Sequence, residues 1–218
     1  MKKTAQLRAL LEQYKTVLAE EEFLSFDREV TRLLNHYFEV LSQLPAGAER
    51  GRKVQALIDE QVDASSHIKT TCQKGCGACC HLEVEIMKDD AVILADSLAN
   101  GTTLNHEDLL RLSKRERLDN EWKKGAVSSN RCVFLGADNA CRNYYNRPTV
   151  CRKHSVVSPV EECEKIGGNP VPKLMPMAEI IMSAAINQPD NEFGSLAKML
   201  QKVLDERASA FAMPEAEL

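Results

Sequence analysis

Apolar residues recur at helical spacing through the N-terminal third of the chain. One run begins at Leu7, a second begins near Ser25, and a third extends from about Ala48 to His67. A proline at position 45 and a glycine at position 47 separate the second run from the third. The pattern predicts that residues 1–70 form an antiparallel helical hairpin or a three-helix unit.

Shorter elements are predicted in the middle of the chain. Alternating residues from His81 to Ile86 favour a short strand. Asp89 or Asp90 is placed to cap the helix that follows, and Asn105 is placed to cap another helix that runs to about residue 124. Residues 132–135 and 141–145 flank a turn-rich segment and could pair as a hairpin.

The C-terminal part begins with a stretch rich in proline and glycine from Ser158 to Pro176. Helical spacing then predicts two helices at about residues 177–187 and 193–210. The predicted fold is mainly α, with a helical bundle or hairpin flanking a small cysteine-rich metal-binding core that contains a short β-hairpin. We divide the chain into a helical region (1–70), a cysteine-cluster core (71–157) and a C-terminal loop with helices (158–218), packed as one domain.

The composition is that of a soluble globular protein, with 218 residues, 44% hydrophobic and 28% charged. No stretch approaches the ~20 apolar residues that a membrane span needs. The lysine-containing N-terminus lacks the continuous apolar segment of a secretory signal. We therefore expect a cytoplasmic protein without a membrane partner, in a compartment where thiols stay reduced.

Charge is unevenly distributed along the chain, whose net charge is −4. Residues 69–81 contain two lysines and no acid, and residues 131–154 contain five basic residues against Asp138. We favour the interpretation that these cations offset nearby thiolates. An anion-binding face for phosphate, carboxylate or nucleic acid is the alternative, and we do not expect a nucleic-acid partner.

Seven of the eight cysteines fall in two groups, and this is the strongest chemical signal in the chain. The first group is a C-x3-C-x2-C-C run with glycines at two positions that let the backbone curl. Thiolates at such spacing converge on a metal ion or an iron–sulfur cluster. The seven predicted ligands are Cys72, Cys76, Cys79, Cys80, Cys132, Cys141 and Cys151. Cys163 stands apart from both groups and is expected to be a free thiol.

In order and spacing, both groups resemble those of the YkgJ-type cysteine-cluster family, small bacterial proteins described as zinc- or iron-chelating. The resemblance covers about residues 72–154 and includes a C-x-F-L stretch at 132–135, Tyr145, Arg147-Pro148 and Cys151-Arg152. Val133 stands where the family often has proline. The resemblance implies a metal centre without defining an activity. Flagellin-lysine methylases carry a similar cysteine motif, which implies that the motif can also serve a methyltransferase.

The identity of the metal is left open by the sequence. Seven thiols exceed one tetrahedral zinc site, and the adjacent Cys79 and Cys80 tend to point apart. Two metal sites, or one site with some free thiols, are both compatible with this count. An all-sulfur set suits an iron–sulfur cluster or zinc, and we favour the cluster. Four residues are expected beside the ligands as hydrogen-bond donors: Arg147, Arg152, His154 and His81. Either histidine could instead be a zinc ligand, and we favour the hydrogen-bonding role.

Three functions are compatible with these features. The metal site could be structural, leaving the helical regions to bind a partner protein. It could be a redox or electron-transfer centre, or it could lie near the active site of an enzyme, for example one related to protein methylation. No Ser-His-Asp or paired-carboxylate arrangement identifies catalytic residues, so neither a substrate nor an oligomeric state is predicted.

Overall fold

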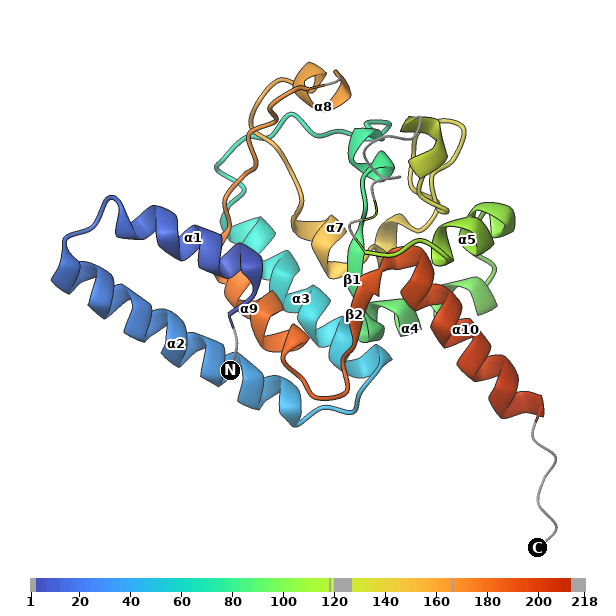
Figure 1. Cartoon of the computed structure of the whole chain (residues 1–218), viewed down its shortest axis with the longest axis horizontal. Helices are drawn as coiled ribbons and strands as arrows, with labels where there is room; N and C mark the ends of the chain where they lie inside the picture. The colour runs from blue at the N-terminus through green and yellow to red at the C-terminus, as the bar shows by residue number, and fades with distance from the viewer. Residues whose placement is uncertain (1–2, 118, 120–126, 166, 213–218) are drawn as a thin grey trace, which may run out of the picture.

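The computed structural model describes residues 3–117, 119, 127–165 and 167–212. It is mainly helical, as the sequence predicts, and two short strands pair within it (Figure 1). The α-helices are α1 (Ala5–Lys15), α2 (Glu20–Ser42), α3 (Ala48–Ala64), α4 (Lys88–Ala99), α5 (His106–Ser113), α7 (Thr149–Lys153), α8 (Glu161–Glu164), α9 (Pro176–Ile186) and α10 (Leu196–Ala212). The 3₁₀ helices are η1 (Ala78–His81), η2 (Val127–Asn130) and η3 (Tyr144–Asn146), and the strands are β1 (Glu85–Met87) and β2 (Phe193–Ser195). Within these described residues, no helix has the length and apolar character to cross a bilayer.

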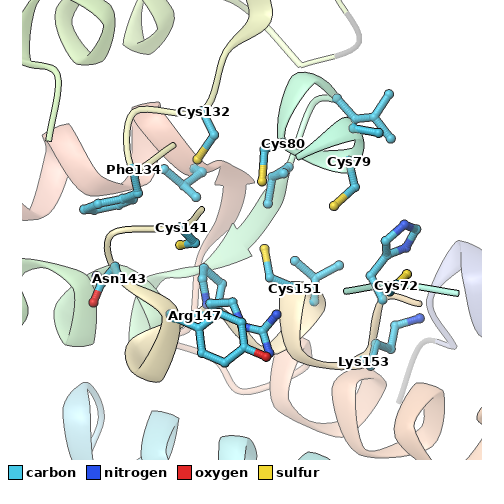
Figure 2. A pocket seen from close by; sticks show the side chains of 18 of the residues that line it. Cys72, Cys79, Cys80, Cys132, Phe134, Cys141, Asn143, Arg147, Cys151 and Lys153 are labelled. Carbon is cyan, nitrogen blue, oxygen red and sulfur yellow. The ribbon is translucent and has the colours of Figure 1, made fainter. Parts of the chain in front are cut away.

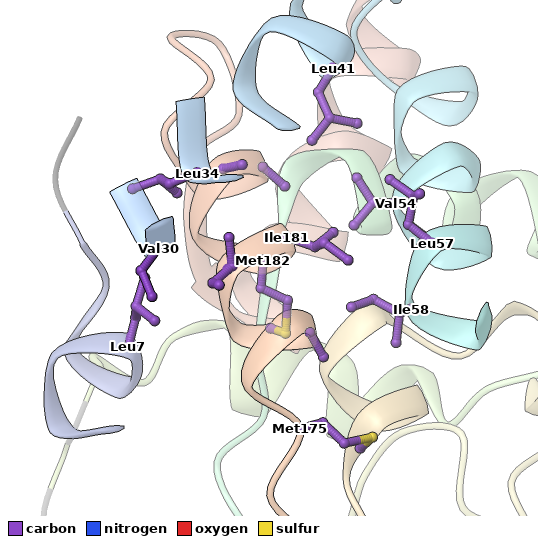
Figure 3. Packing of buried hydrophobic residues seen from close by; sticks show 14 of the residues in the cluster. Leu7, Val30, Leu34, Leu41, Val54, Leu57, Ile58, Met175, Ile181 and Met182 are labelled. Atoms are coloured by element: carbon purple, nitrogen blue, oxygen red, sulfur yellow. The ribbon is translucent and has the colours of Figure 1, made fainter. Parts of the chain in front are cut away.

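The first hydrophobic core is built around α9, which packs against α1, α2 and α3. Helix α9 is apolar on most of its circumference, so it needs neighbours on several sides to shield it from water. The predicted N-terminal helices supply them, with Leu34 of α2 and Ile58 of α3 buried against it (Figure 3). Helix α2 begins earlier than Ser25, because the Glu22 carboxylate accepts a hydrogen bond from the Ala19 amide at 3.0 Å and closes the first turn.

The second core is formed by α4, α5 and α10, together with Val133 and Phe134. Strands β1 and β2 are antiparallel, with Ile86 opposite Gly194, and this pairing leads directly into α10. Because Val133 and Phe134 are buried here, the second core fixes the segment that follows Cys132. The cysteine region is therefore attached on one side to the buried residues of the second core.

The first turn of α4 connects the two cores through two buried carboxylates. Asp89 forms an ion pair with Arg50, with 2.6 Å between Arg50 Nε and Asp89 Oδ2, and it also accepts from the Gly47 amide. Asp90 accepts from the amide and hydroxyl of Thr149 at the start of α7. The prediction that one of these aspartates caps the helix is therefore wrong, since Met87 is the N-cap residue. Both carboxylates face inward, where α3 and α7 offer partners.

The short strands lie elsewhere than the sequence indicated. Residues 132–145 do reverse direction, but they form a single β-bridge between Leu135 and Cys141. The strand expected at residues 81–86 begins at Glu85, and its partner β2 occupies the expected start of the last helix. Helix α5 has the predicted Asn105 cap but ends at Ser113, whereas residues 118 and 120–124 of its predicted extension lie outside the described residues.

Candidate metal centre

A cavity of about 960 Å³ opens beside η1, α7 and α8, and all eight cysteines line it. The thiols come from four separate parts of the chain, since residues 72–80, 132–141, 151 and 163 contribute to the lining. The structure therefore brings all seven predicted ligands to one cavity. All eight are free thiols, Cys72 is exposed, and the others are partly buried.

The first cysteine group is shaped by its glycines. Gly75 has a φ of 87°, a conformation that lets the loop turn from Cys72 toward η1. A Cβ at Gly77 would lie 3.3 Å from Asn139 Cβ and from Leu135 Cδ1, so this position brings the loop close to the second group. The Cys132 amide donates to the Cys80 carbonyl at 2.7 Å, which joins the two groups directly.

The second group is held by the cores beneath it. Val133 and Phe134 anchor Cys132, and the buried Asp90 holds the first turn of α7, which carries Cys151. Figure 2 shows the sulfurs of Cys79, Cys80, Cys132 and Cys151 directed toward the same space, with Cys141 at its edge. This arrangement is expected where soft donors converge on an inorganic centre.

Burial opposes ionisation of the innermost thiols. Burial raises the pKa of Cys132 to about 11, and the neighbouring Cys141 and Cys79 add to the effect. Burial also raises the pKa of Cys151 well above its ordinary value, with repulsion from Cys132 and Cys79. A hydrogen bond from the Cys80 thiol lowers the pKa of Cys79 and raises that of Cys80. These thiols can ionise together only when a cation compensates their charge, and a bound metal does this.

Arg147 lines the cavity. Burial raises the pKa of Cys141, and the positive charge of Arg147 opposes this rise. The same charge adds to the lowering of the Cys79 pKa by the Cys80 hydrogen bond. Its guanidinium lies 3.9 Å from the centre of the Tyr144 ring. The buried Arg147 Nε has no hydrogen-bond partner among the residues that the structure describes. It is therefore available to donate to a sulfur or to a bound group.

Of the other three residues predicted beside the ligands, one lines the cavity and two do not. Arg152 does not line the cavity; it pairs with Asp59 at 2.7 Å, and its Nε donates to the Arg147 carbonyl at 3.0 Å. It therefore supports the backbone that carries Arg147. His154 lines the cavity, and burial together with Lys153 lowers its pKa. His81 lies outside the lining, with Nδ1 3.1 Å from the Gly77 carbonyl oxygen.

Cys163 is the residue that sequence reasoning left out of the group. Helix α8 contacts η1 and brings this thiol to the same cavity as the other seven. Its distance in sequence and its Pro/Gly-rich surroundings concealed this placement. The one signal was the total, because eight thiols divide evenly into sets of four, whereas seven do not.

The donor set consists of thiols and therefore fits a thiophilic metal. Among the residues that the structure describes, no three His, Cys, Asp or Glu side chains form a group able to hold one metal ion. The sulfurs nevertheless share a cavity and face a common space.

Comparison with known proteins gives one match. Residues 71–170 match the CxxCxxCC family model, whose description is "Putative zinc- or iron-chelating domain". No curated protein and no solved structure matches the chain significantly. The matched residues contain all eight cysteines that line the cavity. Residues 71–170 are therefore similar to the CxxCxxCC cysteine-cluster family, whose model is described by chelation of zinc or iron.

Proposed function

We propose that this protein holds an iron–sulfur cluster as a structural or redox centre in the inner part of the cavity. One observation carries the proposal: thiols from separate segments face one space, and no three of them form a single-ion site within the part of the chain that the structure describes. A cluster distributes its metal atoms over a larger volume than one ion, and each iron takes a thiolate. The inner set would hold it: Cys80, Cys132, Cys141 and Cys151.

The positions of the inner set along the chain support a cluster over zinc. Structural zinc sites usually take their cysteines in pairs separated by two to four residues. Cys132, Cys141 and Cys151 are instead single cysteines on a turn, a β-bridge and a helix. No two of the inner set lie within four residues of each other.

The surrounding residues have defined tasks in this proposal. Phe134 and Val133 are buried next to Cys132 in the chain, and they limit the access of water to its thiol. Arg147 supplies positive charge beside Cys141, and its unpartnered Nε can donate to sulfur. Hydrogen bonds to sulfur and exclusion of solvent are the features by which a protein sets the potential of such a centre. When bound, an iron–sulfur cluster supplies one-electron transfer.

The test is elemental analysis of anaerobically purified protein. We expect a brown protein that contains iron and acid-labile sulfide. Cys132→Ser and Cys151→Ser should each lose most of the iron, whereas Cys163→Ser is the matched control outside the inner set and should keep it. A colourless protein with stoichiometric zinc and no iron would contradict the cluster. So would full retention of iron in both inner variants.

A metal-dependent enzyme is the second candidate, and the size of the cavity favours it. Its volume of about 960 Å³ lies at the upper end of the about 300–1,000 Å³ typical of small-molecule sites. The wall beyond the thiols includes Tyr144 and Phe193, which could contact an organic substrate. This candidate requires a coordination position open to an added ligand. Added azide should then change the visible spectrum, and an unchanged spectrum at saturating azide would reject it.

A further inference from the structure

The cavity extends beyond the thiols to walls that carry no cysteine. Helix α9 contributes Met182 and Ile186, strand β2 contributes Phe193, and α10 contributes Leu196. Met182 belongs to the first hydrophobic core and Leu196 to the second, so this part of the cavity lies where the two cores meet. Spaces between packed helices are common positions for small-molecule sites. These apolar walls are therefore suited to the body of an organic ligand.

The charged side chains along the cavity are not fully balanced. Three carboxylates of the lining form ion pairs, and the pairs are Glu179 with Lys153, Asp138 with Arg142, and Glu85 with Arg117. Among the lysines and arginines of the lining, Arg147 and Lys74 form no ion pair with the residues that the structure describes. Lys74 is exposed on its loop, whereas Arg147 is partly buried. The wall around Arg147 therefore has positive charge that is free to attract an anion.

Arg147 is held in position while its donors stay unused. Its carbonyl accepts from Gln55 Nε2 at 3.2 Å and from Arg152 Nε at 3.0 Å. Its guanidinium lies against the Tyr144 ring, and none of its nitrogens has a hydrogen-bond partner within the described part of the chain. Figure 2 shows this side chain next to Cys151. Because a guanidinium has five N–H donors, Nε can face a sulfur while the terminal nitrogens bind a second acceptor.

The charge near Arg147 favours a carboxylate over a phosphate. Both anions match the parallel donors of a guanidinium. A phosphate monoester carries about −1.5 to −2 charges at neutral pH, whereas a carboxylate carries one. The thiolates of a metal centre add negative charge beside Arg147, so the single charge of a carboxylate is the better match. The apolar walls then select a carboxylate that carries a hydrocarbon body.

We propose that the cavity binds an amphipathic organic monocarboxylate. The carboxylate pairs with the terminal nitrogens of Arg147, and the hydrocarbon body lies against the walls formed by α9, β2 and α10. The proposal rests on the proposed function only in leaving the thiol end of the cavity to a metal centre, and it holds whichever metal is bound. A ligand in this position lies beside the metal centre and shields it from water.

Isothermal titration calorimetry of the anaerobically purified protein tests both parts of the site. We expect one octanoate to bind per chain. Octanoate should bind about tenfold more tightly than hexanoate, because each buried methylene adds roughly threefold to fourfold in affinity. The alcohol 1-octanol has the same chain without the charge, and it should bind at least ~tenfold more weakly than octanoate. Absence of octanoate binding, equal affinities for octanoate and 1-octanol, or tighter binding of octyl phosphate than of octanoate would each overturn the proposal.

Variants assign the charge preference to one residue. Arg147→Gln should bind octanoate and 1-octanol with similar affinity, and preserved binding of 1-octanol shows that its cavity is intact. Arg32→Gln removes an exposed guanidinium on α2, outside the lining, and should match wild type with every ligand. A preference for octanoate that survives in Arg147→Gln would contradict the role of this residue, and the wild-type comparison decides the case even if this variant does not fold.

Metal content measured in the same samples separates this proposal from the proposed function. A protein without iron that binds octanoate contradicts the cluster and supports the carboxylate site. An iron-loaded protein that does not bind octanoate contradicts the carboxylate site alone.

Discussion

Asp90 should make the stability of this protein depend on pH. Its side chain is 1% exposed and accepts from the Thr149 amide at 3.0 Å and the Thr149 hydroxyl at 2.9 Å. Gln55 approaches the same oxygen at 3.5 Å. Burial raises the pKa of Asp90 from 3.8 to about 6, although these hydrogen bonds act in the opposite direction.

The sign and size of the effect follow from this shift. Because the pKa is higher in the folded state, folding favours the protonated carboxyl. The stabilising contribution is complete below pH 3.8, declines as the pH rises, and is lost once the pH exceeds about 6. A shift of about two units corresponds to ~3 kcal/mol, and roughly half of this change falls above pH 5.

Asp90→Asn keeps an oxygen that can accept from Thr149 but cannot ionise. The stability of the variant relative to wild type should therefore increase by about 1–2 kcal/mol between pH 5 and pH 8. Urea unfolding of both proteins at equal metal content measures this difference at each pH. Asp63→Asn on the exposed side of α3 is the control, and its curve should run parallel to wild type. A constant difference between Asp90→Asn and wild type across this range would refute the argument.

Three further predictions concern the scaffold. Arg50→Met leaves Asp89 buried without its guanidinium and should cost about 3–5 kcal/mol in thermal or urea unfolding, whereas Arg50→Met combined with Asp89→Leu should recover most of the loss. Gly168→Ala would place a Cβ 2.0 Å from the Glu162 carbonyl oxygen, so the turn after α8 must shift, and limited trypsin digestion should cleave this segment faster than in wild type. Asn105→Ala removes the hydrogen bond that the Asn105 side chain accepts from the Asp108 amide. It should lower the melting temperature by roughly 2–4 °C, the equivalent of ~1 kcal/mol. An unchanged melting temperature would show that the cap contributes little.

The long helices could be predicted because each has apolar residues at helical spacing over several turns. Neighbouring helices bury these residues. The N-terminal helices and α9 follow this rule, and each has residues that are fully buried. The strands could not be placed, since each spans three residues and pairs with a segment more than a hundred positions away. Nothing local marks Asp89 as the partner of Arg50 instead of a helix cap, because the choice depends on how α3 packs against α4.

The cysteines could be recognised because ligand chemistry leaves a dense pattern in a short stretch of sequence. Their arrangement in space could not be predicted, since the position of Cys163 depends on the contact between α8 and η1. Cys132 continues from the buried Val133 and Phe134, so its ligation is coupled to the second core. Cys72 and Cys163 lie on segments that bury no side chain, so their replacement should disturb the helical body less than replacement of Cys132 does.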